Sequence, residues 1–374
     1  MPIFLIPIIL FLLFLLEKKI FSKYWNRGLS VDLSFDGEEV TEGEEVTLSE
    51  VITNSNFIPL HLLQVNFQTD VGLDFIDTSN ASVTDRVNVI DVFSLRFFER
   101  IKRKLTIDCA KRGFYSILET SLVATDLFSS DIHYDSRTQQ TSLYVYPREL
   151  PYEIIEIPYR QLMGEVLSKK LLYEDNFTFR GIRDYAPTDQ MSSINWKASA
   201  RTGELKVNLH DFTAGPEVMI LLNVEEPGIL YETELIEDSI RLAFTLAKRF
   251  VEDKTSVSLL TNGRDKETRQ VIKLESGASN EHLRNLARAL SRIDVTKGDM
   301  ADIETLIEDD LDSGHGENLT YVLISTSRRD GVTSGAERIV RQKGELTWLC
   351  PLTKSMDQTP PKAMGVRFEP FMHE

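Results

Sequence analysis

The chain has 374 residues, 42% of them hydrophobic and 27% charged, which suits a globular protein of two or three domains and argues against a mainly disordered chain. Acidic residues outnumber Lys and Arg by 58 to 42, so the net charge is −16. This balance disfavours a nucleic-acid partner, because phosphate binding needs a basic face. Cys109 and Cys350 stand apart, and no zinc, nucleotide or catalytic-serine motif occurs, so we predict no metal and no cofactor.

Residues 1–28 predict a transmembrane anchor with a basic flank. The run MPIFLIPIILFLLFLL carries no charge and is at the short end of the length that spans a bilayer. Four Lys and Arg residues follow between positions 18 and 27, opposed by Glu17 alone. By the positive-inside tendency, these bases place the bulk of the chain in the cytoplasm. We therefore expect a single-pass protein of the cell membrane.

Residues 29–150 predict an antiparallel β-sandwich. Apolar and polar residues alternate in this region, as they do at Val31, Leu33 and Phe35. Turn residues such as Asp36 and Gly37 separate the alternating runs. Short strands at regular spacing, with no helical stretch between them, are typical of a sandwich.

Residues 151–215 are predicted to be a connecting segment. Its richest stretch is FRGIRDYAPTDQMSSINWKASARTGELK at 179–206, which is net positive in an acidic chain. One prediction is structural: its charged groups form ion pairs that tie the segment to the next domain, and its aromatic groups anchor it. The residues of this structural prediction are Arg183, Asp184, Asp189, Arg201, Tyr185 and Trp196.

The functional alternative is that the same stretch is a recognition surface for a protein partner or an anion. The candidate interaction residues are Arg180, Arg183, Asp184, Tyr185, Asp189, Trp196, Lys197, Ser199 and Arg201. A second alternative is an enzyme of unknown type, because paired carboxylates can perform acid–base chemistry. Its site would comprise Asp184, Asp189, Lys197 and Arg201.

Residues 216–374 predict a doubly wound, mostly parallel sheet. Within EVMILLNV, the residues VMILL form a continuous apolar run, as expected of a strand covered on both faces. Apolar residues at helical spacing predict a long helix over 233–253. Strands at TSVSLLT, LTYVLIST and LTWLC alternate with helices near 281–293, 300–312 and 333–343, and RQVIKL is predicted to return as a hairpin. The acidic stretch 294–317 is predicted to be a solvated helix face and loop, or else a docking surface for a basic partner.

The stretch 179–206 resembles the signature of the bacterial family named domain of unknown function fifty-eight. The family's usual pattern is R-x-Y-x-x-G-D-x-x-R-x-I-x-W-x-x-S-A-R, and this chain departs from it at Thr188 and Ser192. The matching residues are Arg183, Tyr185, Asp189, Ile194, Trp196, Ser199, Ala200 and Arg201. Further family elements follow in the family's order, including Arg112-Gly113-Phe114-Tyr115 and Tyr146-Pro147.

This resemblance implies that the C-terminal domain is similar to the von Willebrand factor A fold. It also implies a non-enzymatic accessory or adaptor protein that partners a MoxR-type AAA+ ATPase in complex assembly or envelope maintenance. We therefore expect a membrane-anchored interaction protein, with the enzyme as the alternative.

Proteins of the von Willebrand factor A fold often bind Mg²⁺ through Asp-x-Ser-x-Ser after the first strand. Here Asn223, Glu225 and Pro227 occupy those three positions. Proline offers no ligand and asparagine no charge, whereas Mg²⁺ prefers charged oxygen ligands. We therefore predict a degenerate metal loop. A metal-dependent extracellular adhesion module is a further alternative, and it requires the reversed membrane topology and a working loop.

Overall fold

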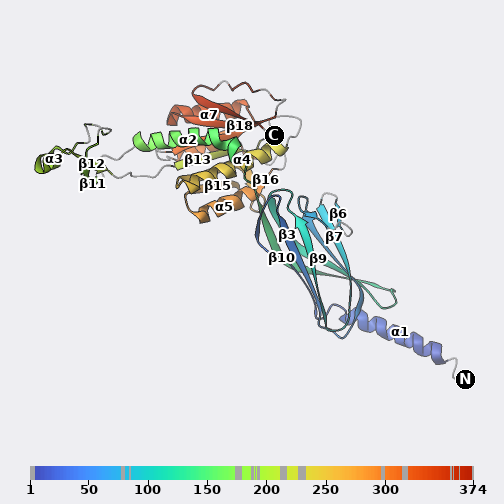
Figure 1. The fold of residues 1–374 in the computed structure, drawn as a ribbon. Helices are drawn as coiled ribbons and strands as arrows, with labels where there is room; N and C mark the ends of the chain where they lie inside the picture. The colour runs from blue at the N-terminus through green and yellow to red at the C-terminus, as the bar shows by residue number, and fades with distance from the viewer. Residues whose placement is uncertain are drawn as a thin grey trace. The chain divides into compact units, whose positions relative to one another are not determined.

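The computed structural model describes residues 5–76, 81–83, 86–172, 179–186, 189, 191, 194–210, 217–225, 233–295, 300–313, 319–353, 356, 358–361 and 363–372. The chain divides into two compact units, Met1–Arg148 and Glu149–Glu374. Figure 1 shows the ribbon of both units, coloured from blue at the N-terminus to red at the C-terminus.

Helix α1, Leu5–Tyr24, begins the first unit. Its uncharged part, Leu5–Leu16, is about 18 Å long at 1.5 Å per residue, whereas the hydrocarbon core of a bilayer is about 30 Å thick. Charged residues follow directly from Glu17 onward. In the part of the chain that the structure describes, no helix is long and apolar enough to cross a membrane. The predicted single-pass anchor, and the cell-membrane location inferred from it, are therefore wrong.

Two sheets form a β-sandwich after α1, which confirms that prediction (Figure 1). One sheet has the order β1-β3-β8-β5, with bounds Leu29–Phe35, Glu45–Asn54, Glu99–Asp108 and Asp74–Phe75. The other has the order β2-β10-β9-β4-β7-β6, with bounds Glu39–Thr41, Ile132–Tyr146, Gly113–Thr125, Leu60–Asp70, Arg86–Leu95 and Ala81–Val83. The pairs are antiparallel except β2 with β10. Alternation of buried and exposed residues along β1 and β7 produces the two-faced sheets.

Charged side chains interrupt the core of the sandwich. Leu48 and Ile52 on β3 belong to separate hydrophobic clusters, and Glu50 lies between them in the strand. Asp91 on β7 of the opposite sheet is fully buried, like Glu50, and forms an ion pair with Arg103 on β8. Two carboxyl groups and one guanidinium thus lie in an otherwise apolar interior, where unpaired charge is costly.

The second unit contains a seven-stranded mixed sheet of order β15-β14-β13-β17-β18-β19, with β16 beside β14. The bounds are Val271–Gly277, Ser256–Asp265, Glu217–Asn223, Leu319–Ser325, Leu346–Leu352, Val366–Met372 and, for β16, Ile293–Asp294. The five strands from β14 to β19 in this order are parallel, whereas β15 and β16 are antiparallel to β14. The prediction of a mostly parallel sheet with a hairpin return is confirmed.

Helices flank this sheet. Their bounds are Thr233–Glu252 for α4, Asn280–Ser291 for α5, Ile303–Asp312 for α6 and Asp330–Lys343 for α7. Side chains of α6 and α7 share one buried cluster with Leu221 and Tyr321 of the sheet, and α4 contacts four of the parallel strands. Helix α2, Tyr152–Leu172, was not predicted; its Tyr159 packs against Phe250 of α4 at a ring-centroid distance of 5.1 Å.

Candidate functional site

The predicted motif forms a hairpin and a short helix, which we call the motif lobe (the described residues of 179–210). Strand β11, Phe179–Asp184, pairs antiparallel with β12, Lys206–His210, and helix α3, Trp196–Thr202, lies between them in sequence. Ile194 and Val207 bridge to each other and are almost fully buried. Because Trp196 is 63% exposed, the prediction that it anchors the segment is wrong.

Polar side chains of the motif build α3 and attach it to the hairpin. Asn195 caps the helix: its Oδ1 accepts from the Ala198 backbone N–H at 2.9 Å. The hydroxyl of Ser199 donates to the Asn195 carbonyl at 2.8 Å and accepts from the Lys206 N–H at 2.9 Å. Gly203 ends the helix at φ 77°, a conformation that glycine adopts without strain. Ser199 is therefore a structural residue of the lobe.

Arg183 and Asp189 form a bidentate ion pair, with both nitrogen–oxygen distances at 2.6 Å. Asp189 also accepts from the backbone N–H of Ala186 at 2.8 Å. The Arg183 guanidinium, together with that N–H, lowers the pKa of Asp189 to about 2. This pair closes the loop after β11. Because both partners belong to the motif lobe, the pair orders the lobe itself and is not the predicted tie to the next domain.

Asp184 and Lys206 pair across the hairpin, where they occupy opposite register positions. The Asp184 carboxylate raises the pKa of Lys206, and Glu204 adds a weaker contact at 3.6 Å. Tyr185 follows, and its backbone N–H donates to the Leu205 carbonyl at 3.0 Å. The side chain of Arg180 lies outside the described residues.

No ion pair between described residues joins the four groups of the hypothetical enzyme site to one another. Asp189 is bound to Arg183 and Asp184 to Lys206, whereas Lys197 and Arg201 form no ion pair with any residue that the structure describes. Among the residues that the structure describes, Arg201 thus has no contact of the kind that the structural prediction gave it. The acids are committed to contacts that hold the lobe together.

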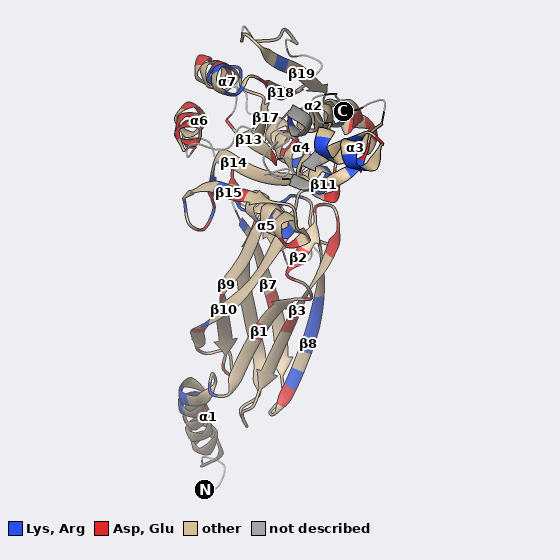
Figure 2. Ribbon diagram, turned by 90° about the vertical axis from the view of Figure 1, so that its left-hand side faces the viewer, with Lys and Arg blue, Asp and Glu red and all other residues tan. Residues whose placement is uncertain are grey.

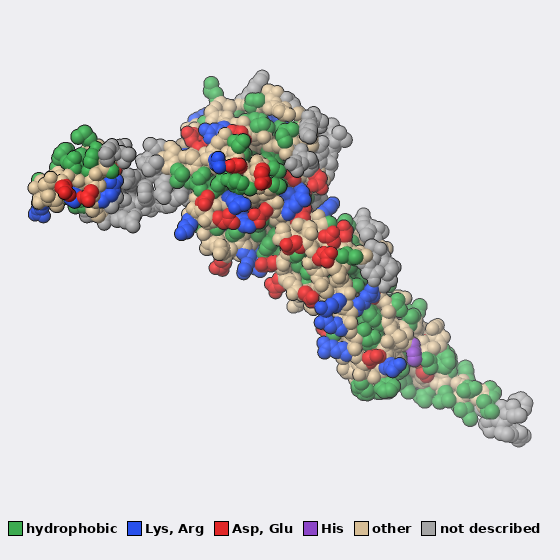
Figure 3. Space-filling view, in the orientation of Figure 1, with side chains coloured by type: hydrophobic (Ala, Val, Ile, Leu, Met, Phe, Trp, Pro, Cys, Tyr) green, Lys and Arg blue, Asp and Glu red, His purple; other side chains and the backbone are tan. Residues whose placement is uncertain are grey.

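An exposed face remains on α3. Lys197 and Arg201 lie on the side of the helix away from the buried Ser199. Trp196, the first residue of the helix, is 63% exposed, and Met191, before the helix, is 70% exposed. Figure 3 shows hydrophobic and basic side chains together on the surface of the lobe. Tryptophan, methionine and arginine are the residue types enriched in protein interfaces. Sequence reasoning did not single out Met191, although it lies within the motif.

Amide and hydroxyl groups fill the loop edge of the large sheet. Asn223, 1% exposed, donates to the Ser325 hydroxyl at 2.9 Å, and its Oδ1 accepts from Asn262 at 2.7 Å and from the Glu225 N–H at 3.1 Å. Glu225 pairs with Arg329. The side-chain oxygen of Asn223 is thus engaged within the protein, which does not fit a metal ligand. Sequence reasoning missed Asn262, whose signal was its place directly after the predicted strand TSVSLLT.

The described part of the chain holds no group of three or more His, Cys, Asp or Glu side chains placed to bind a metal ion. Pro227 and Glu226, which belong to the predicted loop, lie outside the described residues.

Several acids of 294–317 have structural partners. Asp302 caps α6, and the almost fully buried Asp310 accepts from Lys273 at 3.1 Å and from the Tyr321 hydroxyl at 3.2 Å. Glu308 forms an ion pair with Arg338 of α7. These contacts explain part of the acidic composition without a partner.

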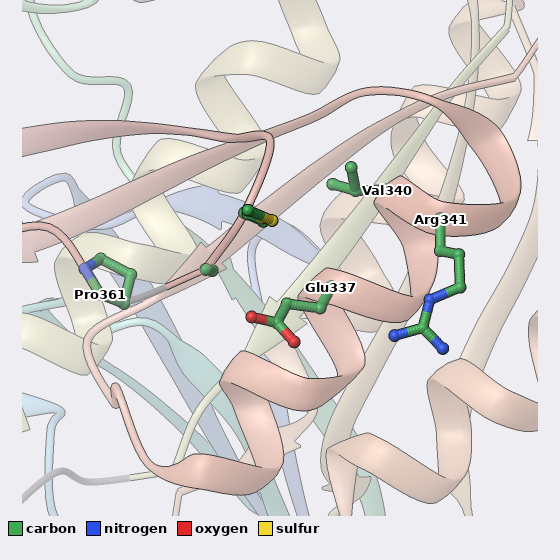
Figure 4. Close-up of a pocket in the computed structure, with 6 residues that line it drawn as sticks. Glu337, Val340, Arg341 and Pro361 are labelled. Atoms are coloured by element: carbon green, nitrogen blue, oxygen red, sulfur yellow. The ribbon is translucent and has the colours of Figure 1, made fainter.

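A cavity of about 630 Å³ lies beside α7. Figure 4 shows Glu337 extending from the helix toward the segment that holds Pro361, whereas Arg341 points away from it. None of the residues that the sequence singled out lines this cavity.

No family model matches the chain, and no curated protein matches it. Part of the chain is similar to solved β-domains. The non-cellulosomal cohesin of the archaeon Archaeoglobus fulgidus is 9% identical over 31% of this chain and 91% of its own, with a TM-score of 0.20. The CARDB domain of the PF1109 protein of Pyrococcus furiosus, solved with di-metal ions, is 9% identical over 30% of this chain and 90% of its own, with a TM-score of 0.19.

The β-glucosidase of Listeria innocua, solved with gluconolactone, is 16% identical over 31% of this chain, with a TM-score of 0.16. The match spans only 16% of that enzyme. At such TM-scores, these similarities carry no argument about chemistry or partners.

Proposed function

We propose that this chain is a non-enzymatic adaptor that binds a protein partner through the exposed face of α3. The supporting observation is that different residues of the motif have different roles. Arg183, Asp184 and Asp189 hold the lobe together through ion pairs, whereas Trp196 and its cationic neighbours remain exposed. A helix that presents an exposed tryptophan beside two cations with no ion pair to any described residue suits docking better than chemistry.

The partner that fits this face carries acidic side chains around an apolar pocket. Lys197 and Arg201 are four residues apart and so lie on one side of α3, and the net charge of the motif is opposite to that of the whole chain. From the resemblance to the family named domain of unknown function fifty-eight, we propose a MoxR-type AAA+ ATPase as the partner, in complex assembly or envelope maintenance. We also propose that the mixed sheet is of the von Willebrand factor A type.

Site-specific crosslinking in the native host tests the proposal. A photoreactive benzoylphenylalanine replaces Trp196 in one strain and Leu118, a comparably exposed residue of β9, in the control strain. The proposal predicts that an AAA+ ATPase is crosslinked from position 196 and not from position 118. If no AAA+ ATPase is identified from position 196, or if it is captured equally from both positions, the proposal is wrong.

A further inference from the structure

A second cationic surface lies on β8 of the sandwich. Arg100, Lys102 and Lys104 alternate along the strand with exposed side chains, whereas Leu105 faces the core. Figure 2 shows these basic residues in blue along β8. Alternate residues of a strand are about 6.8 Å apart, so the three cations form a regular row.

The acids that the structure describes leave this row largely uncompensated. Lys104 has one carboxylate, that of Asp36, at 4.0 Å. Arg100 and Lys102 have no ion pair with the residues that the structure describes, and their cross-strand neighbours on β3 are uncharged. In a chain with a net charge of −16, such a row attracts an anionic partner.

Strand β8 also lies at an edge of its sheet. On one side β3 pairs with it from Glu99 to Asp108. On the other side, the described part of β5 pairs with it only at Ile107 and Asp108, so no described strand flanks the row of cations. An edge of this kind accepts an added strand through its backbone groups.

Two exposed aromatic residues precede the row. Phe97 and Phe98, in the turn that leads into β8, are 62% and 71% exposed. Large apolar side chains beside cations supply the contact area that most interfaces need at their centre. Lysine on an edge strand also blocks unwanted pairing. An acidic strand can still pair there, because its carboxylates attract the row of cations.

We propose that β8 binds an extended acidic segment of a protein partner as an added strand. Carboxylates on alternate residues of that segment lie against Arg100, Lys102 and Lys104, and an apolar residue at its end contacts Phe97 and Phe98. The proposal is independent of the motif lobe, because it rests on a different strand of a different unit.

The test uses the full chain and a fluorescein-labelled peptide of sequence Thr-Glu-Val-Glu-Val-Glu-Phe. We expect saturable binding by fluorescence anisotropy, and slower amide exchange in β8. The double substitution Arg100→Glu/Lys102→Glu should weaken binding at least tenfold, and a peptide with Lys in place of Glu should then bind this variant. The milder Lys102→Gln should weaken binding severalfold. Unchanged affinity in the charge-reversed variant would overturn the proposal.

Two controls separate strand pairing from general attraction. The variant Lys111→Glu/Arg341→Glu, which reverses two exposed cations elsewhere, should keep full affinity, as should Lys197→Glu/Arg201→Glu in the motif lobe. A peptide N-methylated at alternate residues keeps its charges but loses backbone donors, so it should bind at least tenfold more weakly. Equal binding of the methylated peptide, or equal loss in the control variants, contradicts an added strand on β8.

Discussion

Arg183 and Asp189 join the two ends of the loop after β11 through a pair of parallel contacts, each 2.6 Å long. Planar, two-point pairing of this kind is specific to arginine, so lysine at position 183 would not reproduce it. Two charged residues of the motif thus bind each other and stabilise the lobe itself. What the lobe offers to a partner is therefore the neighbouring face of α3.

This pair predicts an unusually acidic Asp189. Its pKa is lowered to about 2 by Arg183 and by the Ala186 N–H. The stability that this ion pair contributes to the loop is therefore fully present above pH 4 and is lost as the pH falls through 2. Carboxyl ¹³C chemical shifts of Asp189, recorded between pH 1.5 and 6, should show a midpoint near 2. In Arg183→Lys the midpoint should move toward the ordinary value of 3.8, whereas a wild-type midpoint near 3.8 would disprove the pairing in solution.

The buried Glu50 carboxyl predicts that the sandwich loses stability as the pH rises from about 4.5 to about 8. Burial, with the nearby Asp91 carboxylate, raises its pKa from 4.5 to about 8. A raised carboxyl pKa contributes fully below pH 4.5, and the contribution disappears as the pH rises through 8, at a cost of up to about 5 kcal/mol. Glu50→Gln should flatten this dependence, and Glu45→Gln, at an exposed position of the same strand, should not.

The measurement is amide exchange in β3 between pH 6 and 9, corrected for the intrinsic exchange rate. Wild type should lose protection across this range. Equal pH dependence in wild type and Glu50→Gln would show that the carboxyl is not the cause.

The surroundings of Gly72 predict that a side chain larger than hydrogen at this position destabilises the sandwich. A Cβ at this position would lie 2.2 Å from the Tyr115 hydroxyl oxygen, and its φ of +130° belongs to a region reserved for glycine. Gly43 also has a positive φ, of +88°, but has open space around it. Gly72→Ala should cost about 2–4 kcal/mol and Gly43→Ala about 1 kcal/mol in the free energy of unfolding. Denaturant unfolding of both variants checks this order, and equal costs would contradict it.

The hydrogen bonds of the buried Asn223 amide predict that the stability of the large sheet depends on this side chain. Asn223→Ala leaves the Ser325 hydroxyl and the Asn262 amide without this partner in a buried site, at a cost of about 2–4 kcal/mol. Asn280→Ala, at an exposed position, should change the free energy of unfolding by less than 0.5 kcal/mol, as is usual for surface sites. Amide exchange in β13 and β17 reports the difference, and a cost below 0.5 kcal/mol for Asn223→Ala would contradict the network.

Periodicity predicted most of the architecture. The alternation at Val31 and Leu33 reflects burial of one face, and the continuous apolar run 218–222 reflects burial of both faces. Both segments form strands of the expected kind. Helix α2 was missed because Pro158 and scattered charges blur its pattern. The predicted membrane anchor was wrong because it was based on the number of apolar residues. The uncharged part of α1, from Leu5 to the residue before Glu17, is shorter than a bilayer requires.

Composition alone could not assign roles within the motif. Arg183 and Arg201 look equivalent in sequence, yet the first forms an ion pair and the second lies on the exposed face of α3. Which charge meets which partner depends on the hairpin register that places Asp184 opposite Lys206. The buried carboxyl pair could not be predicted for a similar reason. The alternating pattern of β3 does not reveal that Asp91 of the opposite sheet lies near Glu50.

The central claim is that α3 presents a docking face for an acidic partner. The most direct measurement is the affinity of the full chain for the AAA+ ATPase identified by crosslinking, determined by titration calorimetry. We expect Lys197→Glu/Arg201→Glu to weaken binding at least tenfold and Trp196→Ala by a similar factor, while the matched control Lys111→Glu/Arg341→Glu binds as wild type does. Wild-type affinity in the α3 variants would contradict the claim.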